Sequence, residues 1–570
     1  MAKKSKKKQH SEDLKKQRVT RLLNMAKEFH RNRQLAMAEQ TYRQIIEADP
    51  FNFTALYLLG ALAAEAGKFK PAAELMRMAI QVRPNYAQAH NDLGVILQQT
   101  GDVKGATECY TKALELNAGF SEALNNLGAT YQSRGNAKKA CEHFKAALDM
   151  NPFYLDANNN YIFARDLSTD ETVESLIEIR KKWSDTHEAP LIKKQKPHTN
   201  DLSLDRKLRI GYISADFRLH SASFVFGQML TEFDKDKFEV YAYSTFNPEL
   251  DARVVQFKNA VTMWTDVSGL SEEVIADIVR KDKIDILVDL AGYSAGNKLT
   301  TFCRKPAPIQ VTAWGYATST GLRSMDYFFA DNVIVPENEK YLYVEEVIYL
   351  PNVVTHYCPE NKPDVKELPA LKDSVITFGS FNRLGKISDE TFELWAQVLH
   401  EVPNSRMMLK ISELSDEKSI EWATEKFTAQ GVAKERVVFL GKTAWYSHLD
   451  TFNQVDIALD PFPHGGGVTT LEGLVMGVPV VTLKWPTIVG RLSSSILTTL
   501  DMTDWIAESK EEYVRIAKEK ASDLQKLSEV RMGLRERFNS SILGNYKAYC
   551  KIVEQEYIKM WEKYVASKSS

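Results

Sequence analysis

One glycine-rich stretch carries residues suited to binding an anion. The segment from Asp460 to Val481 reads DPFPHGGGVTTLEGLVMGVPVV, in which three glycines and two threonines come before a predicted helix. Free backbone N–H groups and the positive end of a helix dipole together attract phosphate. The glycines would permit close backbone approach and positive φ, and Thr469 or Thr470 would cap the helix or offer a hydroxyl to a ligand. A phosphate cradle and an ordinary turn both fit this stretch taken alone.

Other polar residues narrow the chemistry. Glu472, in the first turn of the same helix, would bind a sugar or ribose hydroxyl, or would simply favour the helix dipole. There is no convincing Asp-x-Asp metal motif, and Asp282 and Asp285, near a predicted strand start, are expected to be surface charges. Arg491 would reach a substrate or form a surface ion pair. The five cysteines are scattered without a CxxC pair, which argues against a disulfide framework or structural zinc and favours a reducing, cytoplasmic setting.

Strands and helices are predicted to alternate around the glycine-rich segment. The predicted strands are LRIGYIS, FEVYAYST and IDILVDLAG, and then, after KELPALKDSV, ITFGSFN, SRMMLKIS, RVVFLG, DIALD and VPVVTL. This pattern predicts two successive Rossmann-like α/β domains, residues 206–370 and 371–540. Two such domains facing a cleft form the GT-B fold, in which ligands bind at the carboxyl ends of the strands. A helix over 541–570 carries an aromatic stripe that we expect to pack on the first domain.

The first third of the chain has a repeat of 34 residues. Small residues and prolines recur in phase at Gly60, Gly94 and Gly128, at Gly67, Gly101 and Gly135, and at Pro50, Pro84 and Pro152. This spacing predicts an all-α tetratricopeptide solenoid over 18–165, with about four repeats and a partial one. Asn91, Asn125 and Asn159 form one column, which would bind the backbone of an extended peptide or form a solvated polar face. Residues 1–17 are expected to be a disordered basic tail, and 166–205 a polar linker.

Composition excludes some classes of protein. The 570 residues are 44% hydrophobic and 26% charged, with a formal net charge of −2, as in an ordinary soluble globular protein. A nucleic-acid-binding protein usually shows a basic excess, so we expect no nucleic-acid partner. No uncharged apolar run reaches ~18 residues, which argues against a membrane span. The basic start MAKKSKKKQHSEDLKKQR lacks the apolar core of a signal peptide.

Four segments in the second half resemble a known enzyme family. They are RIGYISADFRLHSASF, PAPIQVTAWGYATSTGLRSMDYFFAD, FGSFNRLGKISDETFELWAQVLHEVPNSRMMLK and FNQVDIALDPFPHGGGVTTLEGLVMGVPVVTL. In this order, and behind a tetratricopeptide array, they are similar to the protein O-GlcNAc transferase family, glycosyltransferase family 41, including its SPINDLY branch. The resemblance implies a GT-B fold. It also implies an inverting, metal-independent transfer from a nucleotide sugar to Ser or Thr of proteins, with no cofactor.

The resemblance implies roles for residues at the reacting end of the donor. His220 matches the active-site histidine, which acts as a base or positions the second substrate, and Lys386 matches the lysine that binds the diphosphate. Arg383 stands where the family has a donor-binding glutamine. The backbone of the glycine run and the two threonines would bind the phosphates; these residues are Gly466, Gly467, Thr469 and Thr470.

The resemblance also implies contacts to the nucleoside. His448 matches a histidine that stacks near the base, Thr443 lies where backbone contacts to the base are expected, and Glu472 matches the acidic residue that holds the ribose. Trp445 replaces a lysine, which puts the base contacts in doubt. The segment from Asp460 to Thr470 is one residue longer than in the animal enzymes and looks more like SPINDLY.

The resemblance implies a protein O-glycosyltransferase, and we expect UDP-GlcNAc to be its donor. Its polypeptide substrate would be bound by the repeat groove, and the similar layout of bacterial relatives suggests a surface protein such as flagellin. Three alternatives stay open: a SPINDLY-like O-fucosyltransferase using GDP-fucose (or a UDP-glucose enzyme), an inactive tetratricopeptide scaffold, and a glycosyltransferase of small metabolites. His220, Lys386 and the intact glycine run count against the scaffold, and the solenoid counts against the metabolic enzyme.

Overall fold

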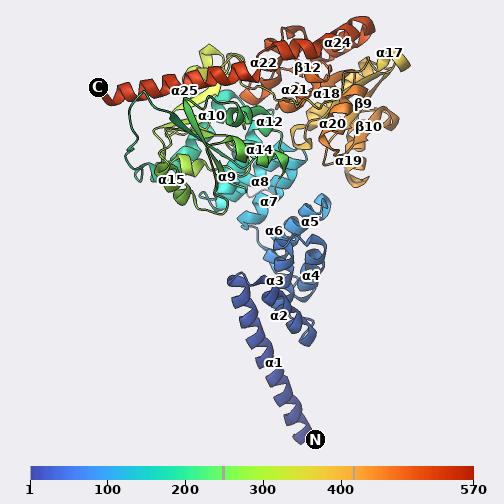
Figure 1. Ribbon diagram of the computed structural model, residues 1–570. Helices are drawn as coiled ribbons and strands as arrows, with labels where there is room; N and C mark the ends of the chain where they lie inside the picture. The colour runs from blue at the N-terminus through green and yellow to red at the C-terminus, as the bar shows by residue number, and fades with distance from the viewer. Residues whose placement is uncertain (1, 247–250, 415–416, 570) are drawn as a thin grey trace. The chain divides into compact units, whose positions relative to one another are not determined.

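The chain folds into two compact units (Figure 1). The computed structural model describes residues 2–246, 251–414 and 417–569. One unit comprises the residues up to 131 together with 139–157, and the other comprises 132–138 and the chain from 158 onward. The first is helical, and the second contains both β-sheets. We call them the repeat unit and, after the function that the family resemblance implies, the catalytic unit.

The repeat unit is built from consecutive helices that pack in pairs. Within the described residues the pairs are α1 (Ala2–Arg31) with α2 (Leu35–Ala48), α3 (Phe53–Glu65) with α4 (Phe69–Val82), α5 (Ala87–Gln99) with α6 (Val103–Leu116), and α7 (Ser121–Ser133) with α8 (Ala137–Met150). The last residues of α7 and the first of α8 belong to the catalytic unit, as does most of α9 (Leu155–Asp166). The predicted tetratricopeptide array is confirmed.

The periodic glycines are required by close packing and by the turns. A Cβ atom on Gly94 would lie 2.5 Å from the ring of Tyr110, and one on Gly128 would lie 2.7 Å from the ring of Phe144. The second glycine column occupies the turn between paired helices, where Gly101 has φ +82°. Only glycine adopts that conformation without strain, which explains the column.

Helix α1 runs through most of the segment for which the sequence predicts a disordered tail. The prediction covers residues 1–17, whereas α1 begins at Ala2. Residues 2–31 contain no glycine or proline and are rich in Lys, Gln, Glu and Leu, all of which have high helix propensity. The helix propensity of these residues therefore outweighs the basic charge on which the prediction of a disordered tail rested.

The predicted polar linker, residues 166–205, is mostly folded against the catalytic unit. It contains α10 (Val173–Trp183), a π-helical turn η1 (Ser184–Glu188) and α11 (Ala189–Ile192). Trp183 is fully buried, and the buried Glu188 carboxylate accepts hydrogen bonds from the backbone N–H groups of Arg323 and Ser324. The segment is polar on average, but a narrow stripe of apolar side chains on it is buried against the catalytic unit.

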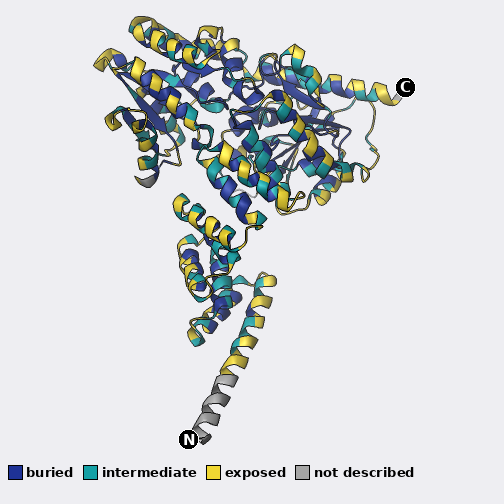
Figure 2. Cartoon of the chain, turned by 180° about the vertical axis from the view of Figure 1, so that it is seen from behind, coloured by how far each residue is buried: buried dark blue, intermediate teal, exposed yellow. Residues whose placement is uncertain are grey.

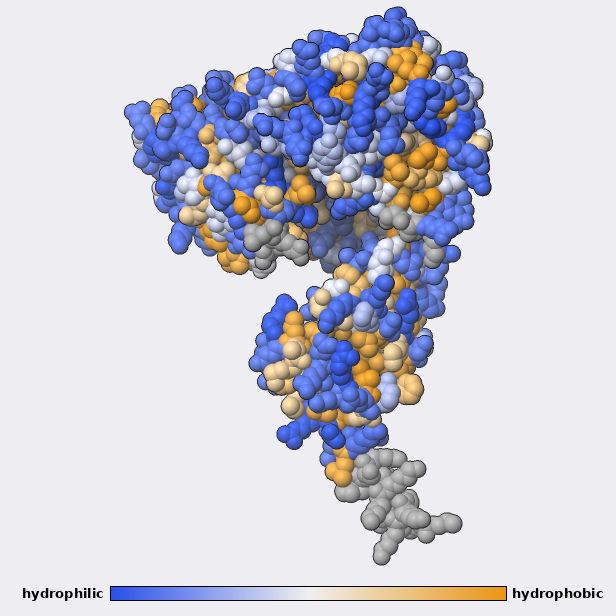
Figure 3. All heavy atoms as spheres, turned by 45° about the vertical axis from the view of Figure 1, so that its right-hand side comes forward, coloured by the Kyte–Doolittle hydropathy of each residue, from blue (hydrophilic) through white to orange (hydrophobic). Residues whose placement is uncertain are grey.

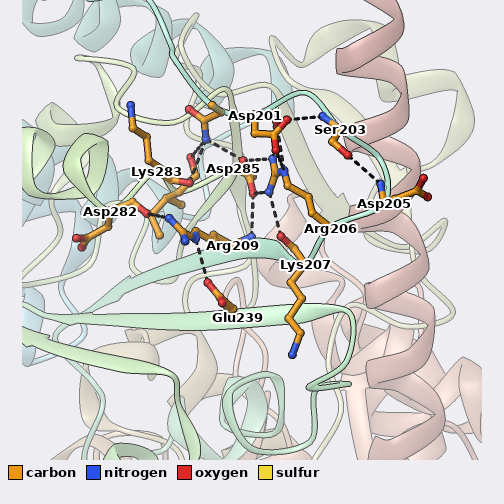
Figure 4. A network of polar contacts seen from close by, with 12 residues as sticks. Asp201, Ser203, Asp205, Arg206, Lys207, Arg209, Glu239, Asp282, Lys283 and Asp285 are labelled. Carbon is orange, nitrogen blue, oxygen red and sulfur yellow. Dashed lines mark hydrogen bonds and ion pairs between the residues drawn. The ribbon is translucent and has the colours of Figure 1, made fainter.

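The end of this segment is held by a buried carboxylate (Figure 4). Asp285 is 1% exposed and pairs bidentately with Arg206, at 2.7 and 2.8 Å. It also accepts from the backbone N–H of Arg209 at 2.9 Å. Asp282 is half-buried and accepts from the Tyr243 hydroxyl at 2.8 Å. The expectation that Asp282 and Asp285 are surface charges is wrong, because both anchor the entry into the first sheet.

Two parallel sheets form the two lobes of the catalytic unit. The first has the order β3-β2-β1-β4-β5-β6-β7 and the second the order β10-β9-β8-β11-β12-β13. The first-lobe strands are β1 (Leu208–Ser214), β2 (Phe238–Ser244), β3 (Met263–Asp266), β4 (Ile286–Asp289), β5 (Ile309–Thr312), β6 (Tyr327–Ala330) and β7 (Glu346–Tyr349). The second-lobe strands are β8 (Ile376–Ser380), β9 (Ser405–Lys410), β10 (Val437–Leu440), β11 (Ile457–Leu459), β12 (Val480–Leu483) and β13 (Ile506–Ala507). The predicted pair of Rossmann-like domains is confirmed, and all the predicted strands are present.

Helices cover the sheets, whose strands are largely buried (Figure 2). In the first lobe these are α12 (Ser223–Phe226), α13 (Gln228–Thr231), α14 (Ala252–Ala260), α15 (Glu272–Lys281) and α16 (Leu299–Phe302). In the second they are α17 (Ala370–Asp373), α18 (Asp389–Glu401), α19 (Glu417–Thr428), α20 (Trp445–Thr451), α21 (Val468–Val475), α22 (Leu492–Thr499), α23 (Lys510–Ser522) and α24 (Leu524–Ser540). The outer surface of the catalytic unit is mainly hydrophilic on the face seen in Figure 3. Every helix in the described residues is too short or too polar to span a bilayer.

The last helix, α25 (Tyr546–Ser569), packs along the first lobe (Figure 1). The hydroxyl of Tyr549 accepts a hydrogen bond from Trp314 Nε1 at 2.9 Å, and Tyr557 meets Tyr212 at 3.2 Å between hydroxyl oxygens. Trp561 is 2% exposed. The aromatic stripe therefore joins the chain terminus to the first sheet, as the sequence predicts.

The sheet orders locate the loops that face a ligand. Strand order reverses between β1 and β4 in the first sheet and between β8 and β11 in the second. Ligands of doubly wound sheets bind beyond the carboxyl ends of the strands at such reversals. The loop after β1 carries His220, the loop after β8 carries Lys386, and the loop after β11 is the glycine run. Topology thus brings the three sequence motifs to the same edge of their lobes.

Candidate functional site

A cavity of about 560 Å³ lies among these loops. Its wall includes residues from the loops after β1, β4 and β5 of the first lobe and from those after β8 and β11 of the second. Five of the residues predicted from the sequence line it: His220, Arg383, Lys386, Gly467 and Thr469. A volume of this size is typical of a ligand pocket.

A buried aspartate holds the loop Asp460–Gly467, which we call the glycine loop. Asp460 is 1% exposed and accepts hydrogen bonds from the backbone N–H of Gly466 at 2.8 Å and from the Thr482 hydroxyl at 2.9 Å. Burial raises the pKa of this carboxyl, and the hydrogen bonds oppose that shift. The sequence analysis assigned no role to Asp460, although it begins the glycine-rich motif.

The glycines of this loop are needed for space. A Cβ on Gly466 would lie 2.3 Å from Thr470 Oγ1 and 2.7 Å from Asp460 Oδ1, and one on Gly467 would lie 3.0 Å from Leu492 Cδ2. Positive φ, which the sequence analysis also expected, is not found at these positions, since the glycines with positive φ lie elsewhere in the described residues. Close backbone approach alone explains the run of glycines.

Helix α21 begins with its first-turn N–H groups uncapped. Its N-cap is Gly467, and within the described residues no side chain caps this terminus. The expected capping by Thr469 or Thr470 is therefore wrong, because both residues already lie inside the first turn. Uncapped N–H groups at a helix start form an anion site, and this one lines the cavity at Gly467 and Val468.

The two threonines of the first turn have different surroundings. Thr469 lines the cavity, and its hydroxyl donates to the Oδ1 atom of Asn382 at 3.1 Å. Thr470 is buried, with its hydroxyl 3.0 Å from that of Ser493. Ser493 in turn donates to the carbonyl of Gly466 at 2.8 Å. Thr469 is thus placed to contact a ligand directly, while Thr470 supports the glycine loop through its hydrogen bond with Ser493.

Lys386 joins the loop after β8 to the glycine loop. Its ammonium donates to the carbonyl of Gly465 at 2.9 Å. Burial lowers the pKa of Lys386 to about 7, with the charge of Arg383 acting in the same direction and that of Asp460 opposing it. A lysine held with a lowered pKa beside a second cation gains its full charge when an anion binds. Lys386 and the exposed Arg383 therefore form a cationic wall.

His220 faces a carboxylate on its own loop. Its Nδ1 atom accepts a hydrogen bond from the backbone N–H of Ala222 at 3.3 Å and lies 3.4 Å from Asp216 Oδ1. Burial lowers the pKa of His220, while Asp216 raises it and Arg218 and Arg383 lower it. With Nδ1 as the acceptor, the neutral ring carries its proton on Nε2. A shift of that proton to Nδ1, toward Asp216, would give the tautomer whose Nε2 lone pair can take a proton. The sequence analysis did not single out Asp216, four residues before His220.

A second group of predicted residues lies outside the lining of this cavity, and we call it the His448 side. His448 Nε2 is 3.2 Å from Glu472 Oε2, and its ring packs beside those of Phe381 and Phe452. The hydroxyl of Thr443, which is exposed, accepts from Lys410 Nζ at 2.7 Å. Burial lowers the pKa of Lys410, while the charge of Glu472 raises it.

The two lobes meet on the His448 side through aromatic rings. Trp445, one turn before His448, stacks on Phe224 of the first lobe, with the ring centroids 6.1 Å apart and the planes at 13°. His356 also packs against Phe224, with the ring centroids 6.1 Å apart, and burial lowers the pKa of His356 to about 4. No local pattern in the sequence marks Phe224 and His356, because the residues that they contact are distant from them along the chain.

Comparison with known proteins identifies the family. A model described as glycosyl transferase family 41 matches residues 181–361 and 364–553. The chain belongs to this family. Tetratricopeptide-repeat models match residues 23–90, 87–120 and 109–142 of the repeat array.

Relatives of this family 41 chain include plant and bacterial proteins. It is 37% identical over 366 residues to the probable UDP-N-acetylglucosamine–peptide N-acetylglucosaminyltransferase SPINDLY of Arabidopsis thaliana, covering 63% of this chain and 40% of the relative. It is 29% identical over 368 residues to the protein SEC of that plant, covering 62% and 37%. A solved mutant of the Thermobaculum terrenum O-GlcNAc transferase matches with a TM-score of 0.77 and 29% identity, covering 97% of this chain and 99% of that one. The chain thus spans about 40% of the length of its curated SPINDLY relative. The match to the solved O-GlcNAc transferase structure confirms the GT-B fold.

Arg491 of this family 41 chain joins the lobes. It is 7% exposed and pairs bidentately with Glu339, at 2.6 and 2.7 Å, and also donates to the carbonyl of Ile334 at 3.1 Å. The ion pair raised as one alternative for Arg491 is present, but it is mostly buried and not on the surface, and Arg491 lies outside the lining of the cavity. Its role is to hold the second lobe against the first.

The predicted asparagine column is buried. Asn91 is 3% exposed, and its Oδ1 accepts from Asn126 Nδ2 at 3.0 Å. Asn125 is 7% exposed, and Asn159 is 8% exposed with its Oδ1 accepting from Trp183 Nε1 at 2.9 Å. The solvated polar face is therefore excluded for this column. Peptide binding by Asn91 and Asn125 stays a prediction. The amide oxygen of Asn159 already accepts a hydrogen bond from Trp183, which lies in the segment predicted to be a linker.

The described residues contain no group of three or more His, Cys, Asp or Glu side chains arranged to hold a metal ion. The expected independence from metals stays a prediction.

Proposed function

We propose that this family 41 chain is an inverting, metal-independent protein O-glycosyltransferase that transfers GlcNAc from UDP-GlcNAc to Ser or Thr of a polypeptide. One observation supports this more than any other: a single cavity is lined by His220 from the first lobe and by Lys386 and the start of α21 from the second. A base and an anion site on opposite lobes are what a displacement at a sugar carbon requires. The names of the SPINDLY and O-GlcNAc transferase relatives agree with the same class of reaction.

The anion site would stabilise the departing nucleotide. In the reaction the bond between the anomeric carbon and the β-phosphate oxygen breaks, and its electron pair leaves on the nucleoside diphosphate. The charge that develops there would be met by Lys386, by the hydroxyl of Thr469 and by the first-turn N–H groups of α21. Fixed donors aimed at developing charge usually make the largest contribution to catalysis.

His220 would act as the base. The hydroxyl oxygen of the substrate Ser or Thr forms the new bond to the anomeric carbon from the face opposite the phosphate, and its proton passes to His220 Nε2. For this step Nδ1 would donate to Asp216 in place of accepting from the Ala222 N–H, and Asp216 would then hold the tautomer that leaves Nε2 free. The lowered pKa of His220 keeps the ring neutral at physiological pH, which is the form that a base needs.

The repeat unit would bind the protein that is to be glycosylated. Tetratricopeptide arrays bind polypeptides rather than catalyse, and a small metabolite needs no such array. The scaffold alternative remains less favoured, because His220 and Lys386 both line the cavity of a family 41 fold. A surface protein such as flagellin is the partner that we would test first.

GDP-fucose is the second candidate donor. The segment from Asp460 to Thr470 looks more like the SPINDLY branch than like the animal enzymes, although SPINDLY and SEC of Arabidopsis thaliana are both named as UDP-N-acetylglucosamine transferases. Trp445, which stacks on Phe224, also stands where the O-GlcNAc transferases have a lysine. The Trp445 position lies on the His448 side of the site, so it bears on the nucleoside of the donor and leaves the proposed chemistry unchanged.

A thermal-shift screen with UDP, GDP, UDP-GlcNAc and GDP-fucose tests the donor. A selective rise in Tm with UDP and UDP-GlcNAc supports the first candidate, and a selective rise with GDP and GDP-fucose replaces it with the second. No rise with any of the four would remove the enzyme proposal. His220→Ala should keep the Tm shift while transfer falls about 100-fold, and loss of the shift would instead put His220 in the nucleotide pocket.

A further inference from the structure

The cavity has a third wall, which belongs to neither lobe. Gln132 from the end of α7 and Asn160 and Phe163 from α9 line it together with the lobe residues. These helices belong to the helical part of the chain, and Phe163 stacks on Tyr316 of the first lobe at 5.0 Å. The proposed function gives roles to the two lobes and leaves this wall unexplained.

The chain segment that carries Gln132 is fixed directly on the loop of Lys386. A Cβ on Gly135 would lie 2.0 Å from the carbonyl oxygen of Ile387, and one on Gly385 would lie 3.0 Å from the carbonyl oxygen of Gln132. Gly135 also has φ +74°, so glycine is required there twice over. The two backbones are therefore in contact beside Lys386.

An arginine fastens the same segment. Arg134 Nη2 donates to the hydroxyl of Ser419 at 3.2 Å, and its guanidinium lies 5.1 Å from the ring centre of Trp422. Held on both sides, Gln132 has a defined position at the edge of the cavity. Such fixed placement is typical of residues that orient a ligand, because little freedom is lost on binding.

The side chain of Gln132 has an unused polar atom. Its Oε1 is buried and has no hydrogen-bond partner among the residues that the structure describes. A buried carbonyl oxygen without a partner is costly, and native proteins rarely retain one without a reason. This oxygen accepts hydrogen bonds and cannot donate them, so its missing partner is an N–H or O–H group.

We propose that Gln132 is a binding residue for the polypeptide substrate, its amide oxygen accepting a hydrogen bond from a backbone N–H near the reacting Ser or Thr. The inference rests on the proposed function. A backbone N–H is present at every residue except proline, so one fixed oxygen serves substrates of different sequence. Under the proposed function the donor has its own polar partners on the second lobe, Lys386 and Thr469 among them, which leaves the helical wall for the second substrate.

The test separates the two substrates. The probes are the sugar nucleotide chosen by the thermal-shift screen and a synthetic peptide mixture with a central Ser or Thr and randomised flanks. In Gln132→Leu we expect the KM for the peptides to rise about tenfold. Hydrolysis of the sugar nucleotide without peptide, and the affinity for the nucleotide, should stay within about twofold of the wild type.

Two further variants serve as controls. Gln132→Glu keeps an accepting oxygen and should recover most of the peptide KM, which a purely structural role would not predict. Lys138→Ala, at an exposed position of the same segment, should behave as the wild type.

Three outcomes would overturn the proposal. An unchanged peptide KM in Gln132→Leu would show that the oxygen has no part in binding the polypeptide. A parallel loss of nucleotide affinity or of sugar-nucleotide hydrolysis would assign Gln132 to the donor. A wild type that hydrolyses the sugar nucleotide but accepts none of the peptides would remove the polypeptide substrate itself, whereas absence of any nucleotide binding would mean that the proposed function has failed first.

Discussion

The glycine-loop side and the His448 side of the site are built in different ways. The first consists of backbone groups and short side chains fixed by buried hydrogen bonds. Examples are the bond from the Gly466 N–H to the Asp460 carboxylate and the bond from the Ser493 hydroxyl to the Gly466 carbonyl. The second consists of rings and long side chains, and its contacts join the two lobes, as in the stack of Trp445 on Phe224. Under the proposed function, the backbone groups would bind what UDP and GDP sugars share, the diphosphate. Side chains at a lobe contact are free to differ between enzymes that use different nucleosides.

The largest effect should follow from removing charge on the glycine-loop side. Lys386→Ala should lower kcat about 100-fold or more, because the ammonium beside Gly465 would stabilise the departing diphosphate. The folded state should be unchanged by circular dichroism. Lys484→Ala, whose ammonium pairs with Glu508 away from the cavity, is the matched control and should keep its activity. Near-normal turnover in Lys386→Ala would break the assignment of the diphosphate to this side.

Binding of the nucleoside diphosphate should weaken as pH rises. The pKa of Lys386 is lowered to about 7 in the free protein, so above that pH the lysine has lost its proton. A bound diphosphate favours the charged form, and binding above pH ~7 must therefore take up a proton. We expect the affinity to fall by up to about tenfold per pH unit there.

Calorimetry in buffers of different ionisation enthalpy measures this uptake. The Lys386→Ala variant should bind weakly at every pH and show no such proton uptake. If it kept the slope of the wild type, another group would be responsible.

The sequence predicts the two sides unequally, and the reason is physical. The glycine loop, its threonines and the helix after it are contiguous, so residue types alone indicate an anion site before any fold is known. The sheets follow from hydrophobic runs such as LRIGYIS, although short strands such as β3 and β13 escape notice because they bury few residues. Local patterns thus carry most of the fold and the glycine-loop side.

Other features depend on contacts that no local pattern shows. Asp216 and Asp460 matter through what they touch, and His356, Phe224 and Gln132 come to the site from separate elements. The segment 166–205 is polar on average, yet Trp183 and Glu188 bury it against the first lobe. Average composition predicts solvent exposure, whereas a few buried residues decide the structure.

A smaller effect should follow from adding one methyl group to the glycine loop. In Gly466→Ala the new Cβ would lie 2.3 Å from Thr470 Oγ1, so the loop must move and its N–H groups lose alignment. We expect the affinity for UDP and for inorganic pyrophosphate to fall by about five- to tenfold alike. Gly533→Ala, where a Cβ meets nothing within 4 Å, is the control and should bind both normally. Unequal losses for the two probes would show that this loop also reads the nucleoside.

The smallest effect, and the most direct test of the difference between the sides, concerns Trp445. Trp445→Lys installs the residue that the O-GlcNAc transferases carry and removes the stack on Phe224. If the His448 side reads the nucleoside, the ratio of the affinities for UDP and GDP should change about threefold, since a lost ring contact is worth no more than this. The affinity for inorganic pyrophosphate should not change, because that probe reaches only the glycine loop. A loss of pyrophosphate binding in this variant would mean that the lobe contact holds the glycine loop in place, and the two sides would then act as a single unit.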